Sequence, residues 1–237
     1  MLTTPIGLTN THSVGVVRDA LVAASVADRK EVGLWSLPVV AETWDGYLND
    51  VNGQHVRAGH LFAALHAASG GPVAEGNVGG GTGMKAYGFK AGIGTASRRV
   101  SEEHGGYAVG VLVQANHGRR SRLVVDGVPV GREIPQSEIP GPDVPAPDAG
   151  SIIAVVATDA PLLPQQCRRL AQRAELGVAR AGGGGENDSG DIFLAFATGN
   201  RGLAAEDDEA APITFPLQML NDDHITELFW AAIEATE

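Results

Sequence analysis

Ser151-Ile152-Ile153-Ala154-Val155-Val156-Ala157 is the stretch that decides the fold. Its unbroken, β-branched apolar character is typical of a strand buried on both faces. Just upstream, residues 139–147 hold closely spaced prolines, which lack an amide donor and bias their predecessors toward extended geometry, so this segment is predicted to be a loop. Ser151 follows Gly150 where the loop enters the core. A small hydroxyl residue at such a border is a candidate nucleophile, although a plain transition from loop to strand has the same pattern.

The composition around this strand indicates one α/β domain. A chain of 237 residues is long enough for a substantial core, and its hydrophobic content of 43% excludes wholesale disorder. Only 5% of the residues are aromatic and 32 are glycine, which predicts a core of Val, Ala, Leu and Ile with many tight turns. This profile favours a layered α/β protein.

Charge and cysteine content limit the partners and the compartment. A net charge of -11 repels nucleic acid and anionic lipid, and the local basic cluster at residues 117–122 is interpreted as a solvated turn. No apolar run approaches the roughly 20 residues needed to span a bilayer. The single cysteine, Cys167, excludes an internal disulfide and a multi-thiolate metal site. We therefore expect a soluble protein in the reducing cytoplasm, with the periplasm left open.

The remaining elements are expected from periodicity and turn residues. Helices are predicted at residues 14–28, 56–68, 161–173 and from about 222 to 237. Further strands are predicted at residues 34–40, 92–97, 107–115, 122–125, 192–197 and 213–217.

The glycine-rich segment at residues 76–83 has two interpretations. It could hold a nucleotide phosphate, but it lacks the Gly-Lys-Ser/Thr sequence of a P-loop and the strand and helix that flank a dinucleotide fingerprint. The favoured interpretation is a backbone that turns sharply or approaches another segment closely.

The histidines do not form a recognisable metal or triad motif. His60 and His66 lie on different faces of the predicted helix, and the chain contains no Gly-x-Ser-x-Gly nucleophile elbow. No metal site is expected, and structural roles are predicted for all seven histidines: His12, His55, His60, His66, His104, His117 and His224.

The tripeptide Ser189-Gly190-Asp191 precedes the predicted strand at residues 192–197. One interpretation is that a glycine loop delivers two polar groups to the mouth of a buried strand. Simple turn chemistry, with Ser and Asp bonding the local backbone, explains the spacing equally well.

Taken together, these segments resemble the L-aminopeptidase/D-esterase and β-peptidyl aminopeptidase family, whose members are self-processing serine N-terminal-nucleophile hydrolases. The resemblance covers nearly the whole chain in order. It rests on residues 4–11 (TPIGLTNT), 39–50 (VVAETWDGYLND), 76–97, 109–116 (VGVLVQAN), 150–153 (GSII), 157–162 (ATDAPL) and 189–196 (SGDIFLAF).

The resemblance implies a fold and a reaction. The fold is a four-layer α/β/β/α sandwich, formed here by one hydrolase domain at residues 1–237. Self-cleavage of the Gly150–Ser151 bond divides it into an α part (1–150) and a β part (151–237). The freed α-amine has a pKa of about 8, against about 10.4 for lysine, so it can accept the hydroxyl proton without a histidine.

The resemblance also implies roles for individual residues. Ser151 is the nucleophile, and Ser189 and Asp191 orient and tune its amine. Asn116 stabilises the oxyanion, and Glu42 helps to bind the free amino group of the substrate. No cofactor or metal is required. The implied substrates are small peptides, amides or esters with a free amino group, and the implied assembly is a homo-oligomer of αβ units.

Family members carry a sizeable segment before the motif at residues 4–11 and continue beyond the last helix. We therefore expect this chain to be truncated at both ends and to lack an early strand. The alternative hypothesis is an inactive, unprocessed fragment that acts only as a structural or binding module. Neither substrate stereochemistry nor a preference for α- or β-peptides follows from the sequence.

Overall fold

The computed structural model describes residues 2–29, 33–141, 150–203 and 212–237. Residues 142–149, which include most of the proline-rich segment and Asp148-Ala149, lie outside the described residues, so the loop prediction is described only at its start. The chain divides into two compact units. Unit 1 comprises Met1–Gly94, Val113–Ile153 and Gly182–Ile192, and unit 2 comprises Thr95–Leu112, Ala154–Ala181 and Phe193–Glu237.

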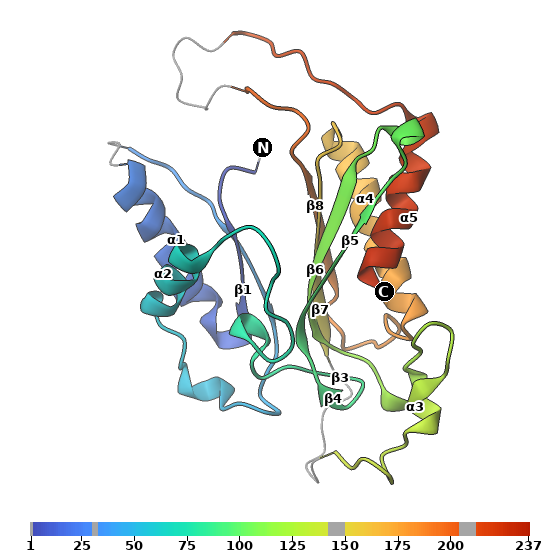
Figure 1. The fold of residues 1–237 in the computed structure, drawn as a ribbon. Coiled ribbons are helices and arrows are strands. Elements are labelled where there is room, and N and C mark those ends of the chain that lie inside the picture. The colour runs from blue at the N-terminus through green and yellow to red at the C-terminus, as the bar shows by residue number, and fades with distance from the viewer. Residues whose placement is uncertain (1, 30–32, 142–149, 204–211) are drawn as a thin grey trace. The chain divides into compact units, whose positions relative to one another are not determined.

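Unit 1 begins with a strand, a helix and a second strand. Strands β1 (Ile6–Asn10) and β2 (Val39–Thr43) are parallel, with Thr9 opposite Glu42. The connection between them contains α1 (Val14–Arg29), as parallel pairing requires a crossover. Figure 1 shows α2 (Ala58–Ala67) beside α1. Strand β2 starts later than predicted, so Glu42 lies within the strand and not in a polar segment after it.

The glycine-rich segment turns sharply and packs closely in unit 1. Gly79–Gly81 forms a short 3-10 turn, followed by the small hairpin of β3 (Lys85–Ala86) and β4 (Phe89–Lys90). A Cβ atom on Gly81 would lie 2.7 Å from the Ile93 nitrogen and 2.8 Å from the Gly92 Cα. The predicted close backbone approach is therefore confirmed. A short helix, α3 (Val130–Glu133), follows later in the chain.

A four-stranded sheet has the strand order β5-β6-β7-β8, and each of its strands has residues in both units. Its strands are β5 (Gly92–Arg99), β6 (Ala108–Asn116), β7 (Ser151–Thr158) and β8 (Ile192–Ala197). Strand β7 has a neighbour on each side, and the consecutive residues Ile152, Ile153 and Ala154 are all buried. Burial of both faces, predicted from the apolar run, is confirmed.

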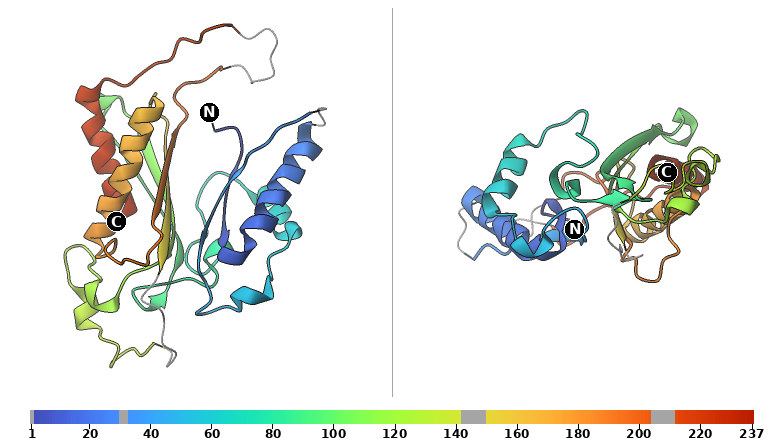
Figure 2. Two further views of the ribbon diagram at one scale, coloured as in Figure 1. Left: turned by 180° about the vertical axis from the view of Figure 1, so that it is seen from behind. Right: turned by 90° about the horizontal axis from the view of Figure 1, so that it is seen from below.

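Two helices complete unit 2. Helices α4 (Pro164–Arg180) and α5 (Ile225–Thr236) lie side by side against one face of the sheet (Figures 1 and 2). They approach closely, because a Cβ atom on Gly177 would lie 2.5 Å from the Ile233 carbonyl oxygen. Helix α4 begins at Pro164 and not at Pro161 as predicted. Leu163 keeps the extended geometry that a residue before proline prefers.

Two predicted strands are wrong. In place of a strand at residues 122–125, a 3-10 turn covers Arg120–Arg122, and Val125 pairs only with Val128 across the expected Asp126-Gly127 turn. The described residues 212–220 contain no regular element. Ile213 and Leu217 are exposed, so the apolar alternation there does not report a buried face, and Pro216 lacks an amide donor. The α/β class itself is confirmed, with helices and sheets in each unit.

Candidate active site

The proposed nucleophile stands at the start of β7, within unit 1. Ser151 is half-buried, whereas Gly150 before it is buried. A Cβ atom on Gly150 would lie 2.2 Å from the Asn116 carbonyl oxygen and 2.8 Å from the His117 Cα, both backbone atoms that cannot swing aside. Only glycine fits there. The Gly150–Ser151 peptide is thus packed against the end of β6.

The tripeptide Ser189-Gly190-Asp191 meets Ser151 through its central glycine. The Gly190 amide donates a hydrogen bond to the Gly150 carbonyl oxygen at 3.2 Å and another to Ser151 Oγ at 3.3 Å. Ser189 Oγ donates to Asp191 Oδ1 at 2.5 Å. In the described part of the chain, neither Ser189 nor Asp191 forms a hydrogen bond with Ser151. The loop therefore contacts Ser151 through the backbone amide of Gly190, and the side chains of Ser189 and Asp191 bond each other.

The side chain of Asn116, the last residue of β6, is held in one orientation. Its Nδ2 donates to the Trp44 carbonyl oxygen at 2.6 Å, and its Oδ1 accepts from the Lys85 amide at 3.1 Å. Asn116 is 4% exposed. Because Oδ1 accepts a backbone hydrogen bond, Nδ2 is fixed as the donor. Its second hydrogen has no partner among the described residues and can serve an oxyanion.

Glu42 lies on β2, and within the described part of the chain no hydrogen bond joins it to the other four predicted residues. Its Oε2 accepts a hydrogen bond of 2.5 Å from Thr11 Oγ1. The residue after it, Thr43, accepts from Gln114 Nε2 at 2.9 Å, and Trp44 bonds Asn116. The strand that carries Glu42 is therefore tied to the end of β6 that carries Asn116. Glu42 itself is half-buried at a separate position.

Sequence reasoning missed a buried aromatic pair in unit 1. Tyr87 and His117 meet edge to face, with their ring centroids 5.2 Å apart. Tyr87 Oη and His117 Nδ1 are buried and have no hydrogen-bond partner among the described residues. His117 follows Asn116 directly in the chain, and this was the one signal that could have singled it out from the other histidines.

Burial keeps both members of this pair neutral. Desolvation, together with the negative charges of Glu186 and Asp191, raises the pKa of Tyr87 to about 12. Desolvation also lowers the pKa of His117, against the opposing effect of Asp191 and Glu186. Both rings thus lie within electrostatic reach of the Ser189-Gly190-Asp191 loop, and His117 is an uncharged imidazole at neutral pH.

The basic cluster at residues 117–122 was predicted to be a solvated turn, but part of it is buried. The Arg120 side chain is buried and donates hydrogen bonds to the carbonyl oxygens of Tyr87 and Gly88, and its guanidinium stacks on Phe89 at 3.6 Å. In the buried site, backbone carbonyl oxygens take the place of water as hydrogen-bond acceptors for the guanidinium. It thereby fixes the hairpin of β3 and β4, which supplies the Lys85 amide to Asn116.

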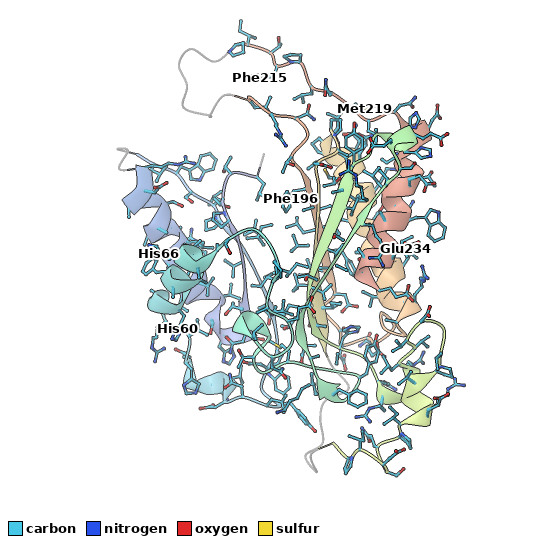
Figure 3. The ribbon with its side chains drawn as sticks, viewed as in Figure 1. His60, His66, Phe196, Phe215, Met219 and Glu234 are labelled. Atoms are coloured by element: carbon cyan, nitrogen blue, oxygen red, sulfur yellow. The ribbon has the colours of Figure 1, made fainter. Side chains whose placement is uncertain are left out.

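His60 and His66 project from α2, as Figure 3 shows. His60 accepts a hydrogen bond from the Arg57 amide at the start of the helix, and His66 lies 2.9 Å from the Phe62 carbonyl oxygen. Across the described residues, no group of three or more His, Cys, Asp or Glu side chains could hold a metal ion. The same residues include no helix with the length and apolar character needed to cross a bilayer.

Comparison with known families gives a match over the whole chain. The model of peptidase family S58 matches residues 1–237. The β-peptidyl aminopeptidase BapA of Sphingosinicella microcystinivorans is 50% identical over 243 residues, covering 98% of this chain and 60% of the relative. BapA of Sphingosinicella xenopeptidilytica is 52% identical over 204 residues, covering 82% of this chain and 51% of the relative. The chain thus spans about half to three fifths of these relatives.

Solved structures of related enzymes resemble this chain over nearly its whole length. A β-aminopeptidase from Burkholderia sp. superposes with a TM-score of 0.90 at 56% identity, covering 100% of this chain and 65% of that one. The L-aminopeptidase D-Ala-esterase/amidase of Ochrobactrum anthropi superposes with a TM-score of 0.84 at 43% identity, covering 97% of this chain and 62% of that one. That structure is described as a variant of the N-terminal-nucleophile hydrolase fold, so the fold class implied by the resemblance is confirmed.

Proposed function

Because the chain belongs to peptidase family S58, we propose that it cleaves itself between Gly150 and Ser151 and then acts as a serine aminopeptidase. In this proposal, one hydrolase domain at residues 1–237 becomes an α part (1–150) and a β part (151–237). The observation that carries the proposal is the position of Ser151. Its hydroxyl stands at the entrance of a buried strand, bonded to the glycine between Ser189 and Asp191.

Self-cleavage supplies the base that the site otherwise lacks. The new α-amine of Ser151 has a pKa of about 8, so a substantial fraction is neutral near pH 7 and can take the proton from Oγ. Oγ then attacks the substrate carbonyl and forms an acyl-enzyme, which water hydrolyses. The negative charge of Asp191, itself bonded by Ser189, favours the protonated amine that forms in each transition state.

The remaining two predicted residues take binding roles. Asn116 offers the second Nδ2 hydrogen to the developing oxyanion, from a side chain that two backbone bonds already hold in place. Glu42 provides a carboxylate for the free amino group of the substrate. Such a charge-assisted bond favours substrates with an unblocked N-terminus. No metal or cofactor takes part in these steps.

We extend the proposal to partners and compartment. The substrates are small peptides, amides or esters with a free amino group, and the mature protein is a homo-oligomer of αβ units. The net charge of -11 argues against nucleic acid and anionic membranes. A chain whose only cysteine is Cys167 fits the reducing cytoplasm.

The test compares two chromogenic substrates that differ only in the amino group. β-Homoalanyl and L-alanyl p-nitroanilides are offered to the purified protein beside their N-acetylated forms. We expect release of p-nitroaniline from the free amines and at least about a tenfold lower kcat/KM for the acetylated forms, since the bond to Glu42 is lost. Equal rates on both forms would argue against an aminopeptidase. No release from either form would favour the alternative, a structural or binding module.

A further inference from the structure

One backbone amide contacts both reacting groups of the proposed self-cleavage. Gly190 N is 3.2 Å from the Gly150 carbonyl oxygen and 3.3 Å from Ser151 Oγ. The first oxygen belongs to the carbonyl that is attacked, and the second is the attacking nucleophile. A donor in this position serves the cleavage of the chain itself, a reaction distinct from the cleavage of substrates.

The chemistry of that reaction shows what the donor does. Ser151 Oγ attacks the Gly150 carbonyl carbon, closing a five-membered ring and placing a negative charge on the carbonyl oxygen. The C–N bond then breaks, the hydroxyl proton moves to the departing nitrogen of Ser151, and an ester remains. Water adds to the ester and releases the Gly150 carboxylate and the Ser151 hydroxyl. A donor aimed at the carbonyl oxygen lowers the barrier of the first step.

Asn116 does not occupy this position. Its side-chain amide is bonded to Trp44 and Lys85, and it touches Gly150 through its backbone carbonyl oxygen, on the side where a Cβ atom would be. The Gly150 carbonyl oxygen is bonded instead by the Gly190 amide. The precursor and the mature enzyme would therefore rely on different donors.

The surroundings hold this amide in place. The Ser189 amide bonds the Glu186 carbonyl oxygen at 3.1 Å, and Ser189 Oγ bonds Asp191, so Gly190 is held between two anchored residues. Gly150 is fixed by its contact with the backbone of β6. Both sides of the hydrogen bond are thus preorganised, as an oxyanion donor requires.

From these contacts we propose that the Gly190 N–H is the oxyanion donor of self-cleavage, whereas Asn116 serves the substrate. This inference rests on the proposed self-cleavage at Gly150–Ser151. It gives Gly190 a role through its backbone, so the identity of the flanking side chains matters less to this step than the presence of the N–H group.

The test removes the N–H group and keeps a matched control. Gly190→Pro lacks the donor, whereas Gly190→Ala keeps it and adds a Cβ atom 3.3 Å from Ser151 Oγ, which is tighter than an ordinary contact, so the hydroxyl must shift by a few tenths of an ångström. Intact mass after timed incubation gives the cleavage rate of each chain. Removal of one oxyanion donor costs roughly 10²- to 10³-fold in rate. We expect Gly190→Pro to be slower by this factor and Gly190→Ala to stay within about tenfold of wild type.

Because proline could also disturb the fold, an amide-to-ester replacement at residue 190, made with glycolic acid by semisynthesis, removes only the N–H group. Circular dichroism checks the fold of each chain. Hydroxylamine, which intercepts the ester intermediate and so separates the two steps, is added only to the Gly190→Pro and wild-type chains, because it would also cut the engineered backbone ester. We expect slow cleavage of the backbone-ester chain, and slow cleavage of the Gly190→Pro chain that hydroxylamine does not restore. Rapid cleavage of that chain beside a cleaving wild type overturns the inference alone. A wild type that never cleaves overturns the proposed function as well.

Discussion

The two compact units differ in what they bury. Among the described residues of unit 1, the buried polar side chains are Thr9, Asn10, Ser13, Thr43, Asp45, Gln114, Asn116, His117 and Arg120. In the described part of unit 2, buried polar side chains are limited to Thr158 and Gln166, and the interior is filled by residues such as Leu170, Leu228 and Ala232. Unit 1 thus buries many polar side chains beside apolar ones such as Leu21 and Met84, whereas the described interior of unit 2 is almost entirely apolar.

The difference separates positioning from stability. Burying polar groups is unfavourable unless each is hydrogen-bonded, so burial of the network around Thr43, Gln114 and Asn116 costs desolvation free energy. In return, its hydrogen bonds fix the orientation of these side chains. Apolar packing is non-directional and contributes mainly to the free energy of folding. We therefore expect substitutions in unit 1 to affect catalysis and substitutions in unit 2 to affect stability.

The largest effect is expected for Ser151→Ala. Without the hydroxyl there is no self-cleavage and no acyl-enzyme, and turnover should fall on the order of 10⁴- to 10⁶-fold. Thermal unfolding of the intact chain should still be cooperative. Mass spectrometry and p-nitroanilide hydrolysis check this, with Ser69→Ala, an exposed serine of unit 1, as the matched control. A processed and active Ser151→Ala chain would remove Ser151 from the mechanism.

A substitution in the core of unit 2 is expected to show the opposite profile. Leu228 is 0% exposed on α5, and its replacement by alanine should lower the free energy of unfolding by about 2–5 kcal/mol. Turnover per folded molecule should change little. Denaturant titration measures the loss, and Glu227→Ala on the exposed face of the same helix should stay within about 0.5 kcal/mol. A large loss of kcat in the folded fraction of Leu228→Ala contradicts the separation of roles.

Asn116→Ala sharpens the comparison inside unit 1. Loss of one oxyanion donor should reduce kcat by roughly 10²- to 10³-fold. It also leaves the Trp44 carbonyl and the Lys85 amide without their partner, at a cost of about 1–3 kcal/mol in stability. Steady-state kinetics on the processed fraction separates the two effects. A normal kcat with reduced stability would make Asn116 a purely structural residue.

The smallest effect concerns the pH dependence of stability. Burial lowers the pKa of His117, so below about pH 6.5 the unfolded chain binds a proton that the folded chain excludes. Stability should fall as the pH falls below 6.5, by up to about 1.4 kcal/mol per pH unit. His117→Phe should lose this slope. Urea unfolding from pH 7 to 5 measures the pH dependence of the free energy of unfolding. The experiment uses the Ser151→Ala variant, which stays a single chain. If this pH dependence is the same with and without His117, the burial effect is contradicted.

The elements closest to the nucleophile were predicted well from the sequence. The start of β7 at Ser151 follows from an uninterrupted apolar run, which indicates burial on both faces, and the end of β6 at Asn116 lies one residue beyond the strand predicted at residues 107–115. The exposed alternation at residues 213–217 has the same residue types without a partner surface, and the strand predicted there is wrong. A local pattern reports which residues are apolar, but not whether another segment covers them.

The contacts made by Gly190 and by the Tyr87–His117 pair could not be predicted in this way. Gly190 contacts Gly150 through backbone atoms, and such a contact cannot be inferred from the residue types in the sequence beyond the presence of glycine. Tyr87 and His117 come from separate elements and meet only in the folded chain. The roles of Ser151, Ser189, Asp191, Asn116 and Glu42, drawn from the family resemblance, stay predictions until they are tested.

The most direct test of the central claim is the intact mass of the purified protein under denaturing conditions after prolonged incubation. We predict two polypeptides that meet between Gly150 and Ser151, with serine at the new N-terminus. A single species at the full 24.5 kDa, unchanged with time, would contradict self-cleavage and remove the α-amine on which the proposed mechanism depends.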